Sequence, residues 1–253
     1  MGSFRYDFHV HSCLSPCGDA DMTPNNIAGM AHLNGVDIMA LTDHNSSRNC
    51  PAFFTACRRY GVVPVAGMEL TTSEDIHAVC LFETLDDALA FNDVVDARLV
   101  RVKNRQDVFG DQLILDDEDN VVGREEDLLI NATTIALDEV PELVSAHGGI
   151  CYPAHIDKQS NGAISILGDF PHYAGFAMAE LHDRSKRDEY VSRYGLEGMR
   201  LMFSSDAHYL HLLRDGDEND TIEIDADPET DGEELVRKRL FDELRPTFMR
   251  VVE

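Results

Sequence analysis

Short apolar runs alternate with helical patterns along most of this chain. Between the apolar runs, apolar residues recur at the three- to four-residue spacing of helices that bury one face. Such alternation is typical of a parallel sheet or barrel with helices outside it, which predicts an α/β fold. The predicted strands, seven in number, are Arg5–Val10, Asp37–Thr42, Val62–Glu69, Ile76–Phe82, Gly149–Ala154, Gly175–Leu181 and Arg200–Ser204.

Three of the predicted helices have recognisable ends. Thr23-Pro24 places a capping hydroxyl before a proline at the first helical position, and Gly35 suits a left-handed stop. Pro51 and Gly61 bound the second helix in a similar way. The third is expected over Asp138–His147.

Two segments interrupt the alternation. Thr84–Arg105 predicts a long helix, and Gln112–Leu115 with Val121-Val122 predicts a hairpin whose acidic turn is solvated. We expect residues 84–133 to form an insertion, placed as a cap over the functional site.

The C-terminal part is expected to close the same domain, so that residues 1–253 form one unit. Residues 209–253 form this closing segment, with an edge strand at Thr221–Ile224 and a helix at Gly232–Leu244. A chain of 253 residues is long enough for one large domain with a sizeable core.

The charge of the chain narrows its expected partners. Asp and Glu number 47 against 21 Lys and Arg, which gives a formal charge of −26. Such a surface repels duplex DNA, RNA and anionic lipid unless metal ions intervene, so we expect neither duplex nucleic acid nor membrane as a partner. The chain shows no apolar run of about eighteen residues and no signal-peptide pattern, which predicts a cytoplasmic protein.

Several common motifs are absent from the sequence. It contains no Gly-x-x-x-x-Gly-Lys-Ser/Thr or Gly-x-Gly-x-x-Gly run, so nucleotide-cofactor folds lack their phosphate cradle. The Gly-x-Ser-x-Gly elbow of serine hydrolases is missing too. Six cysteines without a secretory signal are expected to be buried thiols rather than disulfides.

Histidines and acids collect instead at the ends of the predicted strands. In a barrel, the carboxyl ends of parallel strands and their loops carry the chemistry. Imidazoles and carboxylates are ligands for zinc, manganese or iron, and a carboxylate can bridge two ions. His77 does not fit, because it begins the fourth strand. The residues at strand ends are His9, His11, Asp43, His44, Glu69, His155, Asp206 and His208.

Five of these stretches, in this order, resemble the motifs of the polymerase and histidinol phosphatase (PHP) superfamily of metal-dependent phosphoesterases. They are Asp7-Phe8-His9-Val10-His11-Ser12, Ala40-Leu41-Thr42-Asp43-His44-Asn45, Gly67-Met68-Glu69, Pro153-Ala154-His155 and Ser205-Asp206-Ala207-His208. The resemblance implies a distorted seven-stranded, TIM-like (β/α) barrel with two or three divalent ions at its mouth.

The resemblance also implies a ligand set for each ion. The first ion would be held by His9, His11, Glu69 and Asp206. The second would be held by Glu69, His77 and His155. The third would be held by His44, His208 and one residue of the loop after His11.

This loop is longer than the short turn common in the family. Aligning back from Thr23-Pro24 makes Asp19 the third ligand, whereas counting forward from His11 favours Cys17. We prefer Asp19, because a hard carboxylate suits manganese or iron in phosphate chemistry better than a thiolate does. Cys17 would then be an ordinary thiol.

Other residues near the strand ends are candidates for supporting roles. Asp7 and Asp43 neighbour proposed ligands and are placed to accept an imidazole N–H, with a polar strand end as the alternative. Glu180 and His182 end the sixth strand and are expected to support a ligand or face the substrate. Arg184 lies at the same rim, as a phosphate clamp or a surface arginine.

These residues predict hydrolysis of a small phosphorylated substrate, a phosphomonoester or a short nucleotide. Glu69 would bridge two ions that generate hydroxide, and His208, His182 or a metal-bound water would protonate the leaving oxygen. Two alternatives are a metal-dependent amidohydrolase, which usually needs a modified lysine bridge, and a non-catalytic metal-binding scaffold. The sequence does not predict the oligomeric state.

Overall fold

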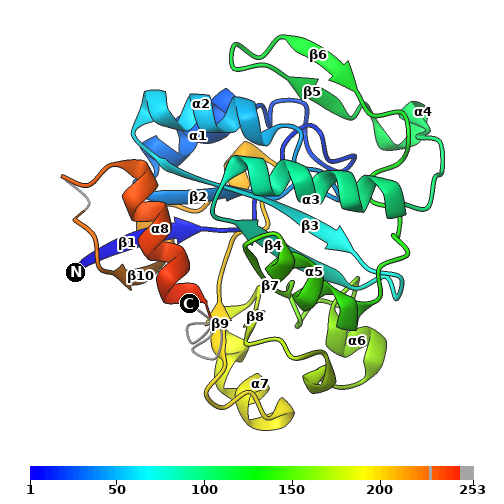
Figure 1. The fold of residues 1–253 in the computed structure, drawn as a ribbon, viewed down its shortest axis with the longest axis vertical. Helices are drawn as coiled ribbons and strands as arrows, with labels where there is room; N and C mark the ends of the chain where they lie inside the picture. The colour runs from blue at the N-terminus through cyan, green and yellow to red at the C-terminus, as the bar shows by residue number, and fades with distance from the viewer. Residues whose placement is uncertain (228–229, 246–253) are drawn as a thin grey trace.

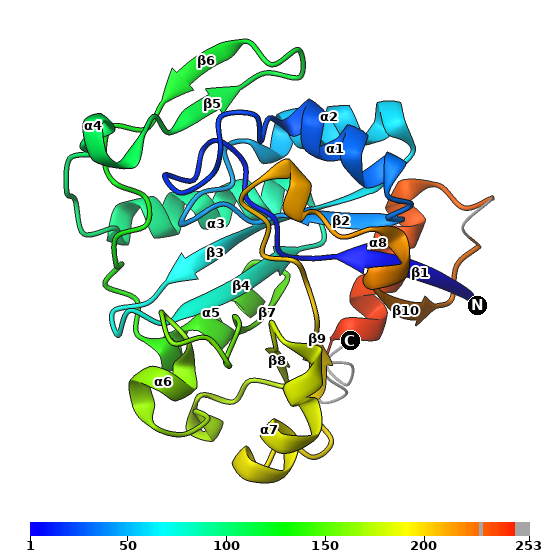
Figure 2. The ribbon, with the colours of Figure 1, turned by 180° about the vertical axis from the view of Figure 1, so that it is seen from behind.

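The computed structural model describes residues 1–227 and 230–245 as an α/β fold. Its centre is a curled half-barrel sheet in the order β10-β1-β2-β3-β4-β7 (Figure 1). The six strands are β1 (Gly2–Asp7), β2 (Ile38–Leu41), β3 (Val63–Thr71), β4 (His77–Phe82), β7 (Gly149–Pro153) and β10 (Asp220–Ile224). A separate parallel pair, β8 (Met178–Glu180) and β9 (Arg200–Met202), lies beside β7 (Figure 2).

A strand lies within or overlaps each predicted range, but the strands do not form the expected seven-stranded barrel: five of them join β10 in the sheet, and β8 and β9 form a separate pair. The sheet is also not wholly parallel. β1, β2 and β3 run parallel, whereas β4 runs antiparallel to both β3 and β7. Only residues 72–76 separate β3 from β4, which leaves no room for a crossover helix, so the chain reverses. His77 pairs with Thr71 at the end of β3. Its place at the start of β4 therefore puts it at the same edge as the other strand ends.

Beyond the regular strands, the backbone continues around this edge. Val10 pairs in parallel with Ala207, and the His11 N–H donates to the Ala207 carbonyl oxygen (3.0 Å). The Ile156 N–H donates to the Glu180 carbonyl oxygen (2.9 Å), which joins the end of β7 to β8. The two sheets therefore meet at the edge where the histidines collect.

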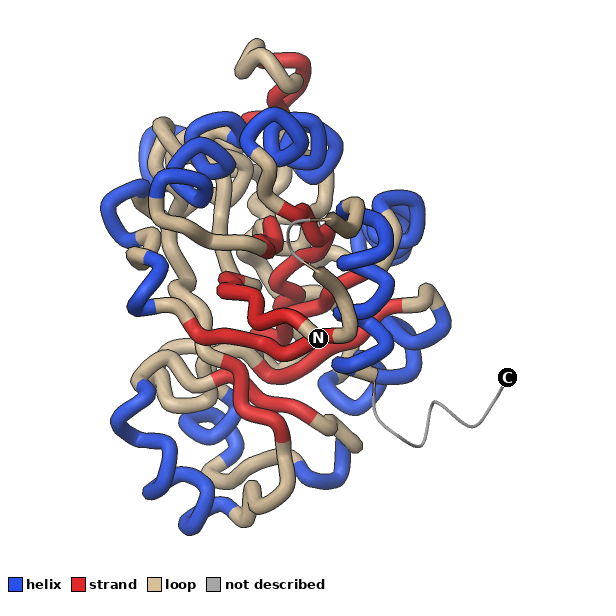
Figure 3. The backbone as a smooth tube through the Cα atoms, turned by 90° about the vertical axis from the view of Figure 1, so that its left-hand side faces the viewer, coloured by secondary structure: helices blue, strands red, loops and turns tan. Residues whose placement is uncertain are grey.

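Helices cover one face of the six-stranded sheet and a single helix covers the other. Buried side chains of α1 (Pro24–Leu33), α2 (Cys50–Tyr60), α3 (Leu85–Arg98) and α5 (Val140–Ala146) form one core with the sheet. α8 (Glu233–Leu244) packs on the opposite face, at the end of the sheet where β1 begins (Figure 1), and its Val236, Leu240 and Phe241 are buried there. In a side view the strands form a curved layer between helices (Figure 3). The two short helices α6 (Ala163–Leu167) and α7 (Arg187–Tyr194) flank β8 and β9 in the chain.

The predicted helix boundaries hold approximately. The Thr23 hydroxyl accepts a hydrogen bond from the Asn26 N–H (3.2 Å) and so caps α1. Gly35 and Gly61 adopt the left-handed conformation after α1 and α2, with φ of 68° and 72°. No helix in the described residues is both long and apolar enough to cross a membrane.

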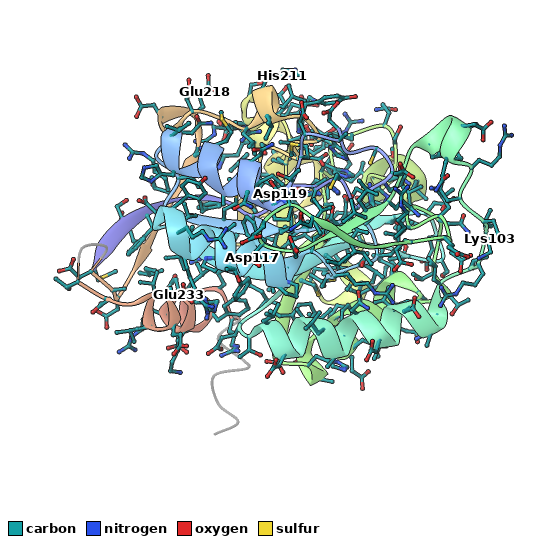
Figure 4. The ribbon with its side chains drawn as sticks, turned by 90° about the horizontal axis from the view of Figure 1, so that it is seen from above. Lys103, Asp117, Asp119, His211, Glu218 and Glu233 are labelled. Atoms are coloured by element: carbon teal, nitrogen blue, oxygen red, sulfur yellow. The ribbon has the colours of Figure 1, made fainter. Side chains whose placement is uncertain are left out.

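The segment expected as an insertion contains α3, α4 (Gln106–Phe109) and the hairpin β5 (Leu113–Leu115) with β6 (Val121–Arg124). The helix ends at Arg98, seven residues before the predicted Arg105, and the chain then turns across the mouth. The acidic turn of the hairpin is not merely solvated, as we expected. Asp119 accepts a hydrogen bond from the Thr23 hydroxyl (2.8 Å), and Asp117 accepts one from the Asn25 amide (2.7 Å) (Figure 4).

Candidate metal centre

The site residues come from strand ends with unusual backbone conformations. β1 ends at Asp7, and the chain continues through His9 and His11 alongside Ala207. His155 and Asp206 have positive φ angles of 27° and 52°, a region that non-glycine residues rarely adopt. Such strain persists where the surrounding structure holds it, most often at functional sites.

The carboxylate of Glu69 lies at the centre of the cluster and is buried. Its Oε1 atom lies 3.2 Å from Nε2 of His9. The same oxygen lies 2.9 Å from Nδ1 of His77 and 2.9 Å from Nε2 of His155. Three strand ends thus direct an imidazole at one oxygen.

The second oxygen of Glu69 faces another set of imidazoles. Oε2 lies 3.2 Å from Nε2 of His11 and 3.1 Å from Nδ1 of His44. Asp206 completes this side, since its Oδ1 lies 3.4 Å from Nε2 of His9 and 3.3 Å from Nε2 of His11. Each oxygen of Glu69 therefore has its own group of nitrogen donors.

Six buried atoms of the cluster make no hydrogen bond with any described residue. A buried polar atom without a partner costs free energy, and native proteins keep few of them. Imidazole nitrogens and a carboxylate oxygen are a donor set that suits zinc, manganese or iron. The residues therefore fit a metal centre. The atoms are Nε2 of His9, His11 and His77, Nδ1 of His44 and His155, and Oδ1 of Asp206.

The potential ligand atoms form three overlapping sets, each within 4.8 Å. The first is His9, His11, Glu69 and Asp206, the same four residues that the resemblance implies for the first ion. The second is His44, Glu69 and His77. It includes His44 in the position that we expected for His155, although His155 also touches Glu69. The third is His11, His44 and His208.

The loop after His11 brings neither of its candidate ligands into these sets. The Asp19 N–H donates to the His208 carbonyl oxygen (2.9 Å), but its carboxylate accepts from the Asp21 N–H (2.9 Å) and so faces its own loop. Cys17 is exposed and belongs to none of the three sets. All six cysteines are free, and four of them are buried.

Asp43 organises this loop rather than an imidazole. It accepts hydrogen bonds from the Ser12 N–H (2.7 Å), the Ser12 hydroxyl (2.6 Å) and the Ser15 hydroxyl (2.7 Å). The Ser15 oxygen lies 3.0 Å from Nδ1 of His11. The expected direct contact with an imidazole is therefore wrong for Asp43, which reaches His11 only through Ser15.

Glu180 makes the contact that we expected of Asp7 and Asp43. Its Oε2 accepts from Nδ1 of His9 (2.9 Å) and from the main-chain N–H of His155 (3.0 Å). A proton held on Nδ1 leaves Nε2 of His9 free to bind a metal. Asp7 accepts main-chain N–H groups of His9 (3.3 Å) and Ser205 (3.1 Å) and interacts with the Ser205 side chain, so it contacts no imidazole.

The charges of the cluster shift its pKa values in opposite directions. Burial opposes the charged form of Glu69, but the imidazoles of His77 and His9 outweigh burial and hold its pKa well below the usual range. The pKa of His11 is raised to about 8, because Asp206 and Glu69 outweigh its burial. Burial and the neighbouring His11 lower the pKa of His208 to about 4. The Nδ1–H of His208 donates to the Asp206 carbonyl oxygen (3.0 Å).

The remaining candidates lie at the rim. The guanidinium of Arg184 lies 3.3 Å from Asp220 and over the ring of Phe203, at 4.9 Å from its centroid, so it is engaged away from the metal cluster. His182 is exposed, and its main-chain N–H donates to Asp157 (2.8 Å).

Sequence reasoning missed two residues of this rim. Lys158 contacts the carboxylate of Asp206, and Asp157 holds the loop after β8 through the N–H groups of His182 and Asp183. Both directly follow His155 on the same loop, a position that would have identified them.

Comparison with known proteins gives a family and a fold. A sequence model described as the PHP domain matches residues 7–227. A 5′-3′ exoribonuclease of Haemophilus influenzae is 30% identical over 80 residues, which cover 30% of this chain and 28% of the relative. An uncharacterized protein of Methanocaldococcus jannaschii is 28% identical over 101 residues, covering 36% of this chain and 59% of the relative. The chain thus matches less than two thirds of either relative's length.

Solved structures share the fold at low sequence identity. The lesion-specific endonuclease Q of Pyrococcus furiosus aligns with a TM-score of 0.63 and 17% identity, over 94% of this chain and 55% of that one. A Bifidobacterium adolescentis protein described as a metal-dependent phosphoesterase aligns with a TM-score of 0.52 and 17% identity, over 93% and 95% of the two chains.

One of these neighbours overturns an expectation. Endonuclease Q is also seen in complex with a 27-mer duplex that carries an abasic lesion at the active site, with a TM-score of 0.62, 17% identity and coverage of 96% and 57%. The acidic composition led us to expect that duplex nucleic acid is not a partner, and this expectation was therefore wrong. Net charge describes the whole surface, whereas cations in one cleft decide the local field that a phosphate meets.

Proposed function

The chain belongs to the PHP domain family, whose relatives named above are hydrolases, and we propose that it hydrolyses a phosphate ester at a multinuclear metal centre. The observation that carries this proposal is Glu69, whose two oxygens face different groups of imidazoles. A carboxylate in this position bridges two cations when both groups are filled. Binding one ion in a structural role would not need a second group.

We propose two or three divalent ions, of zinc, manganese or iron. Divalent ions supply the positive charge that activates a water nucleophile and stabilises the phosphoryl oxygens. The residues that would hold them are His9, His11, His44, Glu69, His77, His155, Asp206 and His208, with Asp19 as a further loop ligand only if its carboxylate turns inward.

The protein's own contribution is to orient these side chains before the substrate arrives. Glu180 fixes the ring of His9, and Asp43 fixes His11 through Ser15. The lowered pKa keeps His208 neutral near pH 7, which supports a role as a ligand and argues against a role as the acid that protonates the leaving oxygen.

We propose that the domain extends over residues 1–253, with 84–133 as an insertion that forms one wall of the mouth and 209–253 as the closing segment, of which 228–229 and 246–253 lie outside the described residues. Support for the wall comes from Asn45 and Asn49. The Asn45 amide donates to the carbonyl oxygens of Leu129 (2.6 Å) and Asn131 (2.9 Å). Asn49 accepts from the Leu115 N–H (3.0 Å). Both asparagines follow the second strand, next to His44.

For the substrate we propose a short nucleotide or another small phosphomonoester. The endonuclease and exoribonuclease named above act on nucleic acids, which favours a nucleotide over other phosphate esters. The phosphodiester of a longer nucleic acid has the same reacting group, so it belongs among the compounds to be tested.

The experiment is metal analysis of purified protein, followed by a panel of phosphate esters and amides with manganese, zinc and iron. Glu69→Gln keeps the shape but removes the charge between the two imidazole groups. It should lower metal content and turnover while unfolding stays cooperative. Glu189→Gln, on the exposed surface of α7, is the matched control and should retain both.

Three outcomes would contradict the proposal. Wild-type turnover in Glu69→Gln would refute the two-ion assignment. Bound metal without cleavage of any ester would support the scaffold, and cleavage of amides alone would support the amidohydrolase.

A further inference from the structure

Arg214 differs from every other cation that the structure describes. Each of the other arginines and lysines in residues 1–227 and 230–245 forms an ion pair with a carboxylate. Arg214 forms none with these residues, and its guanidinium lies instead 3.5 Å from the main-chain oxygen of His182. In a chain with 47 acidic residues, a half-buried guanidinium without a carboxylate calls for a different partner.

Arg214 reaches the rim of the metal centre from the loop after β9. Figure 4 labels His211 and Glu218, which lie before and after Arg214 on this loop. Its backbone is fixed by a hydrogen bond, because the Asn34 amide donates to the Arg214 carbonyl oxygen (3.1 Å). The side chain contacts His182, two residues beyond Glu180, which holds His9.

A second cation lies close to the same histidine. Lys158 contacts the carboxylate of Asp206. Although His182 is largely exposed, partial loss of water around its ring lowers its pKa, and the nearby charges of Lys158 and Arg214 lower it further. Its ring makes no hydrogen bond with the described residues, so it is open to a ligand.

Two of the carboxylates near these groups already have partners, and a third, the buried Asp7, feels the charge of Arg214 without forming an ion pair with it. Asp157 accepts from the N–H groups of His182 and Asp183 and pairs with Lys186 (3.3 Å). Asp206 is a proposed metal ligand, and ions in the centre would share its charge and leave Lys158 available to an anion. With ions bound, these carboxylates would offset the charges of Lys158 and Arg214 only in part, which leaves this corner able to attract an anion.

We propose that Arg214, Lys158 and His182 form a subsite for a second phosphate group of the substrate, next to the phosphate that is hydrolysed. A guanidinium donates two parallel hydrogen bonds to a phosphate, and an ammonium adds a point charge. The subsite rests on the proposed function, because the first phosphate is the one at the metal centre. It predicts a substrate with two phosphates, either a nucleotide chain or a small bisphosphate.

The test is equilibrium binding of phosphonate analogues to metal-loaded protein, measured by calorimetry. In every analogue, carbon atoms replace the ester oxygens at each phosphorus, including the internucleotide linkage of the dinucleotide, so the analogues bind without turnover. One arm compares a thymidine mononucleotide analogue with a 5′-phosphonate thymidine dinucleotide. The other compares a sugar monophosphonate with the matching bisphosphonate, so the arm that responds identifies the source of the second phosphate.

Arg214→Gln should weaken binding of the two-phosphate ligand about tenfold to a hundredfold and leave the one-phosphate ligand nearly unchanged. Arg214→Lys should recover part of the lost affinity, because lysine restores the positive charge but cannot donate two parallel hydrogen bonds. Arg193→Gln removes the same charge from the exposed surface of α7 and should change neither affinity.

Equal losses for both ligands, or no loss for either two-phosphate ligand in a variant that melts like wild type, would overturn the subsite. The proposed function fails separately. Wild type could hydrolyse no ester and yet bind the two-phosphate analogue more tightly than the one-phosphate analogue, with a difference that depends on Arg214. In that case the subsite stands and the proposed hydrolysis does not.

Discussion

The two ends of the central sheet are equally buried but built differently. At the mouth, Glu69 is 1% exposed and its neighbours include buried atoms without hydrogen-bond partners. At the opposite end, Phe241 of α8 is 0% exposed and packs among apolar side chains such as Leu240 and Phe4. Burial alone therefore does not tell a residue's role. The apolar end stabilises the fold, and the mouth holds buried polar atoms that have no hydrogen-bond partner among the described residues.

Phe241→Ala should show most clearly that the apolar end contributes to stability and not to metal binding. Removal of a buried aromatic ring should lower the free energy of unfolding by about 3–5 kcal/mol, without changing the metal content of the folded protein. Denaturant unfolding followed by circular dichroism measures the first quantity. Leu235→Ala, on the exposed side of α8 (41% exposed), is the control and should cost far less. Loss of metal from folded Phe241→Ala would show that the two ends are not independent.

At the mouth, Glu180→Gln should weaken metal binding by about 10- to 100-fold, because the ring of His9 loses its charged acceptor. Asp7→Asn is the control, since Asp7 accepts hydrogen bonds from His9 and Ser205 without touching the His9 ring and should affect metal binding less. Competition with a coloured chelator measures both affinities. A larger loss for Asp7→Asn would mean that Glu180 is not the residue that orients His9.

Metal affinity should also rise with pH. The pKa of His11 is raised to about 8 and that of His9 is raised well above its usual value, so both carry protons in the metal-free protein near pH 7. Metal binding must displace these protons, which strengthens affinity by up to about tenfold per pH unit for each proton released. Chelator competition between pH 6 and 9 checks this. An affinity that does not change with pH would contradict the protonated state of the cluster.

The same shift has a defined sign for stability. Because the folded pKa of His11 lies above the unfolded value, its contribution is fully present below about pH 6.5 and is lost as pH rises through about 8. Chelator-treated protein should therefore lose this contribution across that window, whereas metal-loaded protein should not. Thermal melts of the two forms at pH 6 and pH 9 make the comparison.

The smallest expected effect lies away from both ends. Thr23→Ala removes the cap of α1 and the contact with Asp119, and should cost about 1 kcal/mol of stability. Metal affinity should not change. Thr23→Ser keeps the hydroxyl and should restore most of the stability, and a drop in metal affinity would connect the hairpin turn with the centre.

The sequence predicted the positions of the strands better than their directions. Apolar runs mark β2, β3, β4 and β7 because these strands are buried on both faces, whereas β1 and β10 alternate between buried and exposed side chains. The direction of β4 was missed, although residues 72–76 are too few for a helix and would have indicated a reversal. His77 seemed misplaced for that reason alone.

At the site, residue types and spacing predicted that His9, Glu69 and Asp206 lie at one edge of the sheet. They did not predict which of the supporting acids contact an imidazole. Whether Asp43 or Glu180 meets an imidazole depends on the direction of each side chain beyond its strand, which spacing does not encode. Arg214 was missed because what distinguishes it is the lack of a carboxylate partner among the described residues. That lack can be seen only in the folded structure.

The central claim is that Glu69 bridges two cations, and anomalous diffraction from crystals grown with manganese or zinc tests it most directly. The account predicts at least two peaks, one beside each oxygen of Glu69 at about 2.0–2.2 Å. A single peak, or peaks that leave Glu69 without a metal contact, would contradict it.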